Sequence, residues 1–154
     1  MSKEMTSLVS HLIETIDNGQ FGLAEAAMRL GERGHPEMAA TFAQLGRERE
    51  SFGEQLRVLN SEADQDANDA GTAPGRIHRG WIAISDAITG DSPVAVLKNI
   101  VEGEAHAITE YEDALEAELS SDVRPVVELQ LVAVKASHKL AAALLAQSQV
   151  TKRP

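Results

Sequence analysis

The sequence contains no cysteine, and aromatic residues make up only 3% of it. Without cysteine the chain can form no disulfide, no thiolate metal site and no cysteine nucleophile. The scarcity of aromatic residues offers little for a β-sandwich, whereas the plentiful alanine, leucine, glutamate and glutamine favour helices. The sequence also has no Gly-x-Ser-x-Gly motif and no phosphate-binding glycine loop, so nothing in it supports nucleophile chemistry.

Positive charge is scarce as well. There are 14 Lys and Arg residues against 24 Asp and Glu, which gives a formal net charge of −10. Phosphate binding requires clustered Lys and Arg, so we expect no nucleic-acid partner. The amphipathic, acidic N-terminus lacks the apolar run of a signal peptide, and we expect no segment to approach the apolar length that spans a bilayer. The sequence therefore predicts a cytoplasmic protein without a membrane partner.

Apolar residues recur at intervals of three and four along most of the chain, which is the spacing of one helix face. The helices expected from this pattern cover about residues 4–32, 36–61, 76–89, 93–119 and 121–149, with a flexible acidic linker at 62–75. No stretch has the strict alternation of a strand. The predicted fold is one all-α domain over residues 1–154. It is an antiparallel four-helix bundle, and the short extra helix lies in the long connection between the second and third long helices.

A single polar residue interrupts the apolar row on each of three expected helices: Arg49, Glu104 and His138. Each lies near the middle of its helix, so the three fall in one layer of an antiparallel bundle. Burial of an isolated charge is costly and normally recruits a partner. We therefore expect Glu104 to pair with Arg49, and His138 to hydrogen-bond into the same layer.

Three further residues at the same level of the bundle complete this predicted polar layer. Gly19 on the first helix has no side chain, which leaves room for a long arginine. Gln20 beside it could reach the layer from the flank, and Lys135 on the last helix could supply a second cation.

Three segments carry a resemblance to a known family: "HRGWIAISDAITG" at residues 78–90, "VLKNIVEGEAHAITEYEDAL" at 96–115 and "VKASHKLAAAL" at 134–144. Together with a looser fit of the first two helices, they resemble an uncharacterised bacterial family of ferritin-like four-helix-bundle proteins, catalogued as a domain of unknown function. The resemblance implies a ferritin-like bundle and a general association with stress physiology. It brings no activity with it.

Ferritin-like dimetal proteins place a Glu on each of two helices and a Glu-x-x-His motif on each of the other two. This sequence retains Glu104 and His138 from that pattern. The remaining positions hold Gly19, Gln20, Arg49, Phe52 and Lys135. A di-iron site needs several anionic oxygens to offset the metal charge, so we expect neither iron oxidation nor iron storage.

The layer allows three interpretations. In the first, it is structural, and the protein is a non-catalytic bundle without a cofactor that acts through protein association. In the second, Glu104 and His138 bind Fe, Mn or Zn together with water, and the protein binds or handles metal. In the third, the layer is a pocket for a small anion or small molecule.

The last expected helix has a second apolar side. It carries Leu129, Val132, Ala136, Leu140 and Ala143. A helix that is apolar on two sides needs two partners. We expect the short helix with Trp81 to cover one end of this side, and the remainder to form a homodimer contact or bind another protein. Trp81, Leu129, Val132 and Leu140 are therefore the candidate interaction surface.

Overall fold

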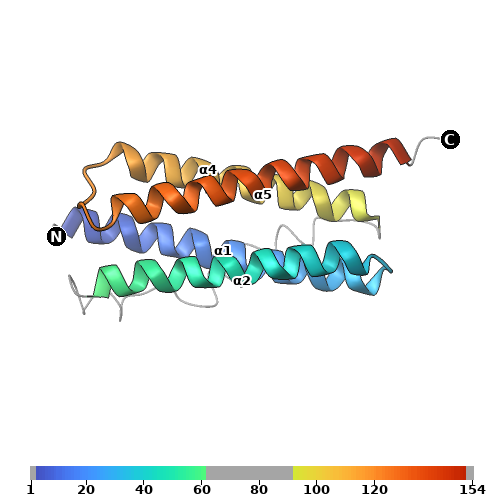
Figure 1. Ribbon diagram of the computed structural model, residues 1–154, viewed down its shortest axis with the longest axis horizontal. Helices are drawn as coiled ribbons and strands as arrows, with labels where there is room; N and C mark the ends of the chain where they lie inside the picture. The colour runs from blue at the N-terminus through green and yellow to red at the C-terminus, as the bar shows by residue number, and fades with distance from the viewer. Residues whose placement is uncertain (1–2, 62–91, 152–154) are drawn as a thin grey trace.

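The structure is a computed structural model that describes residues 3–61 and 92–151. It contains four helices in these ranges and no strand among the described residues, as Figure 1 shows. They are α1 (Lys3–Glu32), α2 (Pro36–Ser61), α4 (Pro93–Glu116) and α5 (Arg124–Thr151). The all-α prediction is confirmed. The helix expected at 76–89, which carries Trp81, and the linker expected at 62–75 lie outside the described residues.

The helix ends follow local sequence signals. Gly34 has φ +83° in the turn between α1 and α2, a backbone conformation that favours glycine, and Pro36 begins α2. Ser92 caps α4, and its hydroxyl accepts a hydrogen bond from the backbone N–H of Ala95. These two helix starts coincide with the residues expected from the sequence.

The turn between α4 and α5 is longer than expected. α4 ends at Glu116 and α5 begins at Arg124, whereas the sequence predicted residues 119 and 121. The Arg124 side chain donates to the backbone oxygens of Leu115 and Ala117, which satisfies carbonyl groups at the end of α4. Pro125 suits the first turn of a helix because it lacks an N–H, and this explains why α5 starts late.

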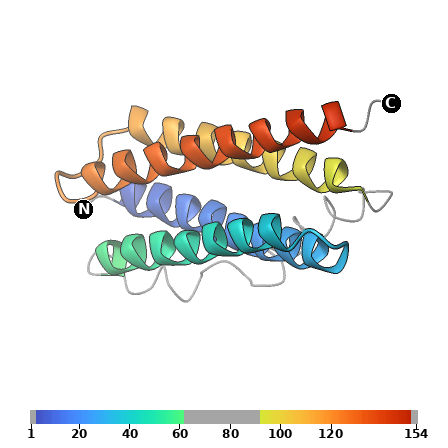
Figure 2. The same cartoon turned by 45° about the vertical axis from the view of Figure 1, so that its right-hand side comes forward.

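The four helices pack side by side around a common core (Figures 1 and 2). α1 contacts α2 and α4, and α5 contacts α4 and α2; the α2–α5 contact is the smallest of the four. α1 and α5 run in one direction and α2 and α4 in the other, so the end of α2 and the start of α4 lie at opposite ends of the bundle (Figure 1). The chain thus forms two antiparallel hairpins, α1–α2 and α4–α5.

The core consists of two apolar clusters. The first lies toward the α4–α5 turn and includes Leu12, Ile16, Leu56, Tyr111 and Val127. The second lies toward the α1–α2 turn and includes Leu23, Leu30, Phe42, Leu97 and Ile100. Each helix passes from one cluster to the other through a stretch of polar or small buried residues. The candidate site lies at this junction.

Hydropathy distinguishes α5 from the other described helices. Among the described residues, Arg124–Val150 of α5 is the one helical segment that is long and apolar enough to cross a membrane by length and composition. The expectation that no segment approaches this length is therefore corrected. The reason is that α5 is apolar on two sides, the side packed in the core and the outer side, and a core helix can pass such a test.

Candidate functional site

An ion pair joins α2 to α4 at the centre of the bundle. Arg49 Nη1 donates to Glu104 Oε1 at 2.7 Å, and Arg49 Nη2 donates to Glu104 Oε2. The two side chains are only 1% and 3% exposed. A bidentate, charge-assisted pair of this kind is among the stronger polar contacts in proteins. The predicted pairing of Arg49 with Glu104 is confirmed.

The third member of the layer is Ser137 of α5. Arg49 Nη2 donates to Ser137 Oγ at 2.7 Å, and the same hydroxyl can donate to Glu104 Oε2 or to the backbone oxygen of Val134. Ser137 is 3% exposed. The hydroxyl therefore lies between guanidinium and carboxylate, and both carboxylate oxygens of Glu104 already accept hydrogen bonds from Arg49.

Gly19 of α1 provides space for the arginine, as the sequence predicted. A Cβ added at Gly19 would lie 3.3 Å from Arg49 Nη1, which is closer than most Cβ contacts. Arg49 Nε is buried and has no hydrogen-bond partner among the described residues. All four helices thus contribute to the layer, three with polar side chains and α1 with the absence of one.

The expected position of His138 is corrected. His138 is only partly buried, and the structure gives it no hydrogen bond or ion pair with any described residue. The buried row of α5 advances by three residues from Val134 to Ser137 and then by four to Ala141. The sequence pattern had advanced by four and then by three. One residue corresponds to a rotation of about 100° around a helix, so Ser137 takes the place expected of His138.

The flanking residues also lie outside the layer. Lys135 is 54% exposed, and its Nζ lies 3.6 Å from Glu112 Oε2 on the surface. Gln20 is partly buried and lines a groove between α1 and α2. Neither is among the side chains that hydrogen-bond Arg49 or Glu104 in the part of the chain that the structure describes. The imidazole of His138, the ammonium group of Lys135 and the amide of Gln20 were expected in the layer, and the hydroxyl of Ser137 is there instead.

A second buried polar network, which was not predicted from the sequence, adjoins the layer. The Tyr111 hydroxyl donates to Gln130 Oε1 at 2.7 Å, and Gln130 Nε2 donates to the backbone oxygen of Phe52 at 3.2 Å and to Gln55 Oε1 at 3.0 Å. Gln130 therefore links α4, α5 and α2. The sequence did indicate that Gln130 faces the core, because it lies four residues before Val134 and so belongs to the same helical row.

Burial sets the acidity of Tyr111, which is 1% exposed. Desolvation raises the pKa of its hydroxyl well above the usual 10.0. The positive charge of Arg49 lowers this pKa and the negative charge of Glu104 raises it, and both effects are smaller than that of burial. The phenol is therefore held in its protonated form, in which it donates to Gln130.

A further ion pair joins α1 to α2 beside the first apolar cluster. Arg57 Nη2 donates to Asp17 Oδ2, and Asp17 is buried whereas Arg57 is 40% exposed. Burial raises the pKa of the Asp17 carboxyl, and the hydrogen bond from Arg57 opposes this rise. The contact ties the two helices of the first hairpin together.

The outer side of α5 is apolar and exposed. Leu129 is 74% exposed, Val132 66% and Leu140 40%, and Ala136 and Ala143 on the same side are exposed as well. The structure thus places three of the four candidate interaction residues on one exposed face. The fourth, Trp81, lies outside the described residues.

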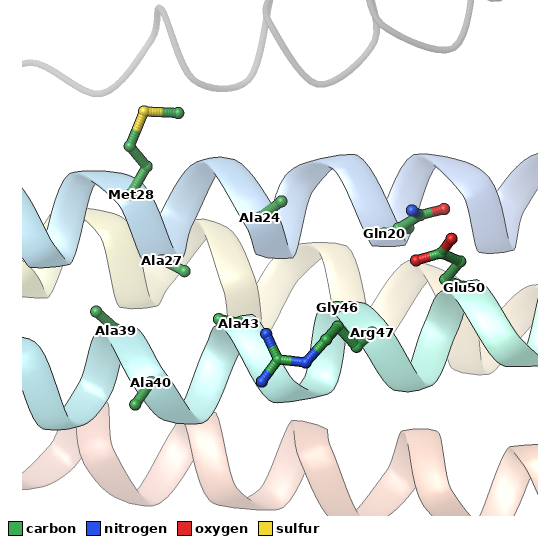
Figure 3. A pocket seen from close by; sticks show the side chains of 10 residues that line it. All are labelled: Gln20, Ala24, Ala27, Met28, Ala39, Ala40, Ala43, Gly46, Arg47 and Glu50. Atoms are coloured by element: carbon green, nitrogen blue, oxygen red, sulfur yellow. The ribbon is translucent and has the colours of Figure 1, made fainter.

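A groove of about 560 Å³ runs between α1 and α2 on the surface. Figure 3 shows its small floor residues, such as Ala24 and Ala43, and the side chains of Gln20 and Glu50, which point toward one another. A second cavity of about 460 Å³ lies where α2 and α4 begin, next to Leu144 of α5. The residues that line these two cavities do not include the polar layer.

Metal ligands are not grouped in the described part of the chain: no set of three or more His, Cys, Asp or Glu side chains there could hold a metal ion. His138 and Glu104, proposed as ligands from the sequence, share no hydrogen bond or ion pair. Glu104 instead uses its carboxylate for Arg49 and Ser137.

Comparison with known proteins gives one match. No curated protein and no solved structure matches the chain. Residues 4–117 match the family described as Domain of unknown function (DUF2383). The matched residues include α1, α2 and α4 with Arg49 and Glu104, whereas α5 lies beyond them. Because the match covers most of the chain, this protein belongs to the DUF2383 family.

Proposed function

We propose that this protein is a non-catalytic, ferritin-like helical bundle that acts by associating with another protein surface through the outer face of α5. The exposed row of Leu129 and Val132 carries this proposal. Contiguous apolar surface of this kind, rimmed by polar residues, marks protein interaction sites in monomeric domains. We keep the cytoplasmic location, with no nucleic-acid or membrane partner, as predictions from the sequence.

The order of the helices supports the ferritin-like part of the proposal. Ferritin-like bundles have one long crossover connection between two helix pairs. Here α2 ends and α4 begins at opposite ends of the bundle, so residues 62–91 connect the two ends (Figures 1 and 2). The remaining two connections, α1 to α2 and α4 to α5, are short.

The polar layer is shielded from solvent and its groups hydrogen-bond one another, which supports the proposal that the protein is non-catalytic. Arg49, Glu104 and Ser137 are each at most 3% exposed. Their charged and hydroxyl groups hydrogen-bond one another, which is how buried charges are normally accommodated. A substrate or metal at Glu104 would have to displace the guanidinium from its two hydrogen bonds. We therefore assign the layer to architecture.

Site-specific photo-crosslinking tests the association. A photoreactive amino acid is placed at Val132 of α5, or at Val58 of α2 as the matched control, and the protein is expressed in cells that contain it natively. Val58 is 64% exposed and Val132 is 66% exposed, so accessibility is equal. We expect irradiation to give discrete protein adducts from position 132 and not from position 58. Equal or absent adduct formation at the two positions would contradict the proposal.

The metal-handling alternative makes a different prediction. A metal that binds only the folded state raises the free energy of unfolding by mass action. Under that alternative, anaerobic addition of Fe(II), Mn(II) or Zn(II) stabilises the wild type, and His138→Ala abolishes the gain. We expect no metal-dependent stabilisation that this substitution removes, which urea denaturation with and without each metal will check.

A further inference from the structure

We propose that the partner of the α5 outer face is a second copy of this chain, packed antiparallel about a two-fold axis, with Glu128 of each copy beside Lys139 of the other. This inference rests on the proposed function and specifies the partner and the geometry of the contact. The structure supports it through the order of apolar residues on α5 and through two charges on one flank of them.

The apolar row has the spacing of a helix–helix seam. Its members follow one another at steps of three and four residues, and they are Leu129, Val132, Ala136, Leu140 and Ala143. This is the spacing at which two helices interlock side chains along a common line. The row spans about 21 Å of helix at 1.5 Å per residue. It lies on the side opposite the buried row of Val127, Val134 and Ala141, so a second helix can pack there without disturbing the bundle.

Two exposed charges flank the row on the same side. Glu128 and Lys139 are eleven residues apart, which is about three helical turns, so they lie on nearly the same line along α5. Neither makes an ion pair or hydrogen bond with any residue that the structure describes. Lys135, on the same flank, instead pairs with Glu112 of α4 in its own chain. The flank thus presents one anion near one end of the row and one cation near the other.

Antiparallel two-fold packing brings these charges together. In such a pair, each flank of one helix faces the same flank of the other, and the direction is reversed. The alignment that sets Leu129 opposite Leu140 of the other copy also sets Val132 within one residue of the level of Ala136. The same alignment places Glu128 within about 3 Å, along the helix axis, of the level of Lys139 of the other copy. The two-fold axis repeats this ion pair, so both charges of both copies gain partners.

A parallel dimer would not satisfy the charges. It would place the flank with Glu128 against the opposite flank, where the residues nearest the row are Ala133 and Leu144. The small side chains of Ala136 and Ala143 also allow close approach of the helices at the seam. A self-complementary patch of this kind is the requirement for an isologous dimer, in which the same surface is used twice.

Reversal of the charges tests the inference. Glu128→Lys places two lysines together at both ends of the contact, and Lys139→Glu does the same with two glutamates. By analytical ultracentrifugation at low salt, from micromolar to millimolar protein, we expect each single variant to weaken the dimer by about tenfold. The double variant E128K/K139E restores both pairs, and we expect its dissociation constant to return to near the wild-type value. Glu102→Lys on α4 makes the same charge change on an exposed residue elsewhere and should leave the dimer unchanged.

Each outcome bears on the inference separately from the proposed function. A monomeric wild type throughout the concentration range overturns the inference, and crosslinked adducts with a different protein from position 132 would still support the proposed function. A dimer that persists in Val132→Glu also overturns it, because the contact then lies elsewhere. Weakening by both single charge reversals without recovery in E128K/K139E overturns the antiparallel geometry. Monomeric variants remain interpretable if circular dichroism shows wild-type helix content.

Discussion

Tyr111 illustrates how a single residue connects the parts of this core. Its ring packs in the first apolar cluster, and its hydroxyl reaches Gln130 at the edge of the polar layer. Gln130 in turn donates to the α2 backbone, so a phenol on α4 positions an amide that links α5 to α2. The α2–α5 contact is the smallest of the four helix contacts. A few polar side chains therefore contribute much of the specific connection between these two helices.

The ionisation of Tyr111 can be measured directly, because the chain contains one tyrosine. Burial raises its pKa above 10.0, so the folded protein should show no phenolate absorbance at the pH where the urea-unfolded chain already ionises. By linkage, the contribution of this group to stability is complete below about pH 10 and is lost as the pH rises from the unfolded toward the folded pKa, by about 1.4 kcal/mol per pH unit. Ultraviolet titration and urea denaturation between pH 8 and 11 check both statements.

Tyr111→Phe provides the control for this titration. It removes the ionisable group, so its stability should lack the loss that begins near pH 10 in the wild type. At neutral pH it leaves Gln130 Oε1 without its donor, at an expected cost of about 1–3 kcal/mol. A folded wild type that ionises together with the unfolded chain would show that the hydroxyl is accessible to water.

At the scale of the helices, the sequence predicted most of what the structure shows, and its failures have a physical cause. On α2 and α4 a single apolar row identifies the core face, and Arg49 and Glu104 therefore stand out in it. α5 has apolar residues on two sides, so the pattern does not determine whether Ser137 or His138 faces the core. Ser137 also carries no charge, and a small buried hydroxyl gives little signal in a sequence.

Two glycines in the first hairpin allow a test of packing between elements. A Cβ added at Gly46 would make ordinary contacts of 3.6–3.7 Å with α1. Gly46→Ala should therefore gain about 0.5–1 kcal/mol, because alanine favours the helix. Gly19→Ala makes the same gain, but its Cβ lies 3.3 Å from an arginine that is held by Glu104 and Ser137. We expect a net loss of about 1–3 kcal/mol from this overpacking.

Urea denaturation of both variants distinguishes the two effects. The two substitutions are chemically identical and both lie within helices, so the difference between them isolates the contact with Arg49. Equal stabilisation by Gly19→Ala and Gly46→Ala would indicate that the guanidinium can shift to accept the methyl group. The layer would then be less rigid than its hydrogen bonds suggest.

At the scale of the whole molecule, the polar layer divides the core into two apolar clusters. Each helix crosses the layer near its middle, so Arg49 and Glu104 fall at one level although α2 and α4 run in the same direction. The crossover between α2 and α4 was less accessible to prediction. Only the length of the connection indicated it, and the structure places its two ends at opposite ends of the bundle.

Removal of one charge should destabilise the entire bundle. Glu104→Ala leaves Arg49 buried without its partner, and we expect the free energy of unfolding to fall by about 3–5 kcal/mol. Glu112→Ala serves as the control on the same helix as Glu104. It removes an exposed glutamate that pairs with Lys135 of α5, and it should cost about 0–1 kcal/mol. Urea denaturation followed by circular dichroism gives both values.

Replacement of both charges completes the test. A double variant with Arg49→Met and Glu104→Leu removes the buried charges together, and we expect it to recover most of the stability lost in Glu104→Ala. A loss of less than about 1 kcal/mol in Glu104→Ala would contradict the assignment of the layer to architecture. The assignment would also be contradicted if the double variant retained its helix content but was as unstable as Glu104→Ala.

The bidentate pair between Arg49 and Glu104 also constrains how this sequence can diverge. The two residues are 55 positions apart, yet a change at either one alone passes through a destabilised protein, whereas a joint change to apolar residues does not. Natural relatives should therefore keep both charges or replace both, and chains with only one of them should be rare. Glycine at position 19 belongs to the same constraint for as long as the arginine is present, because the two compete for one volume. Positions 19, 49 and 104, which lie on three different helices, would then change together in evolution.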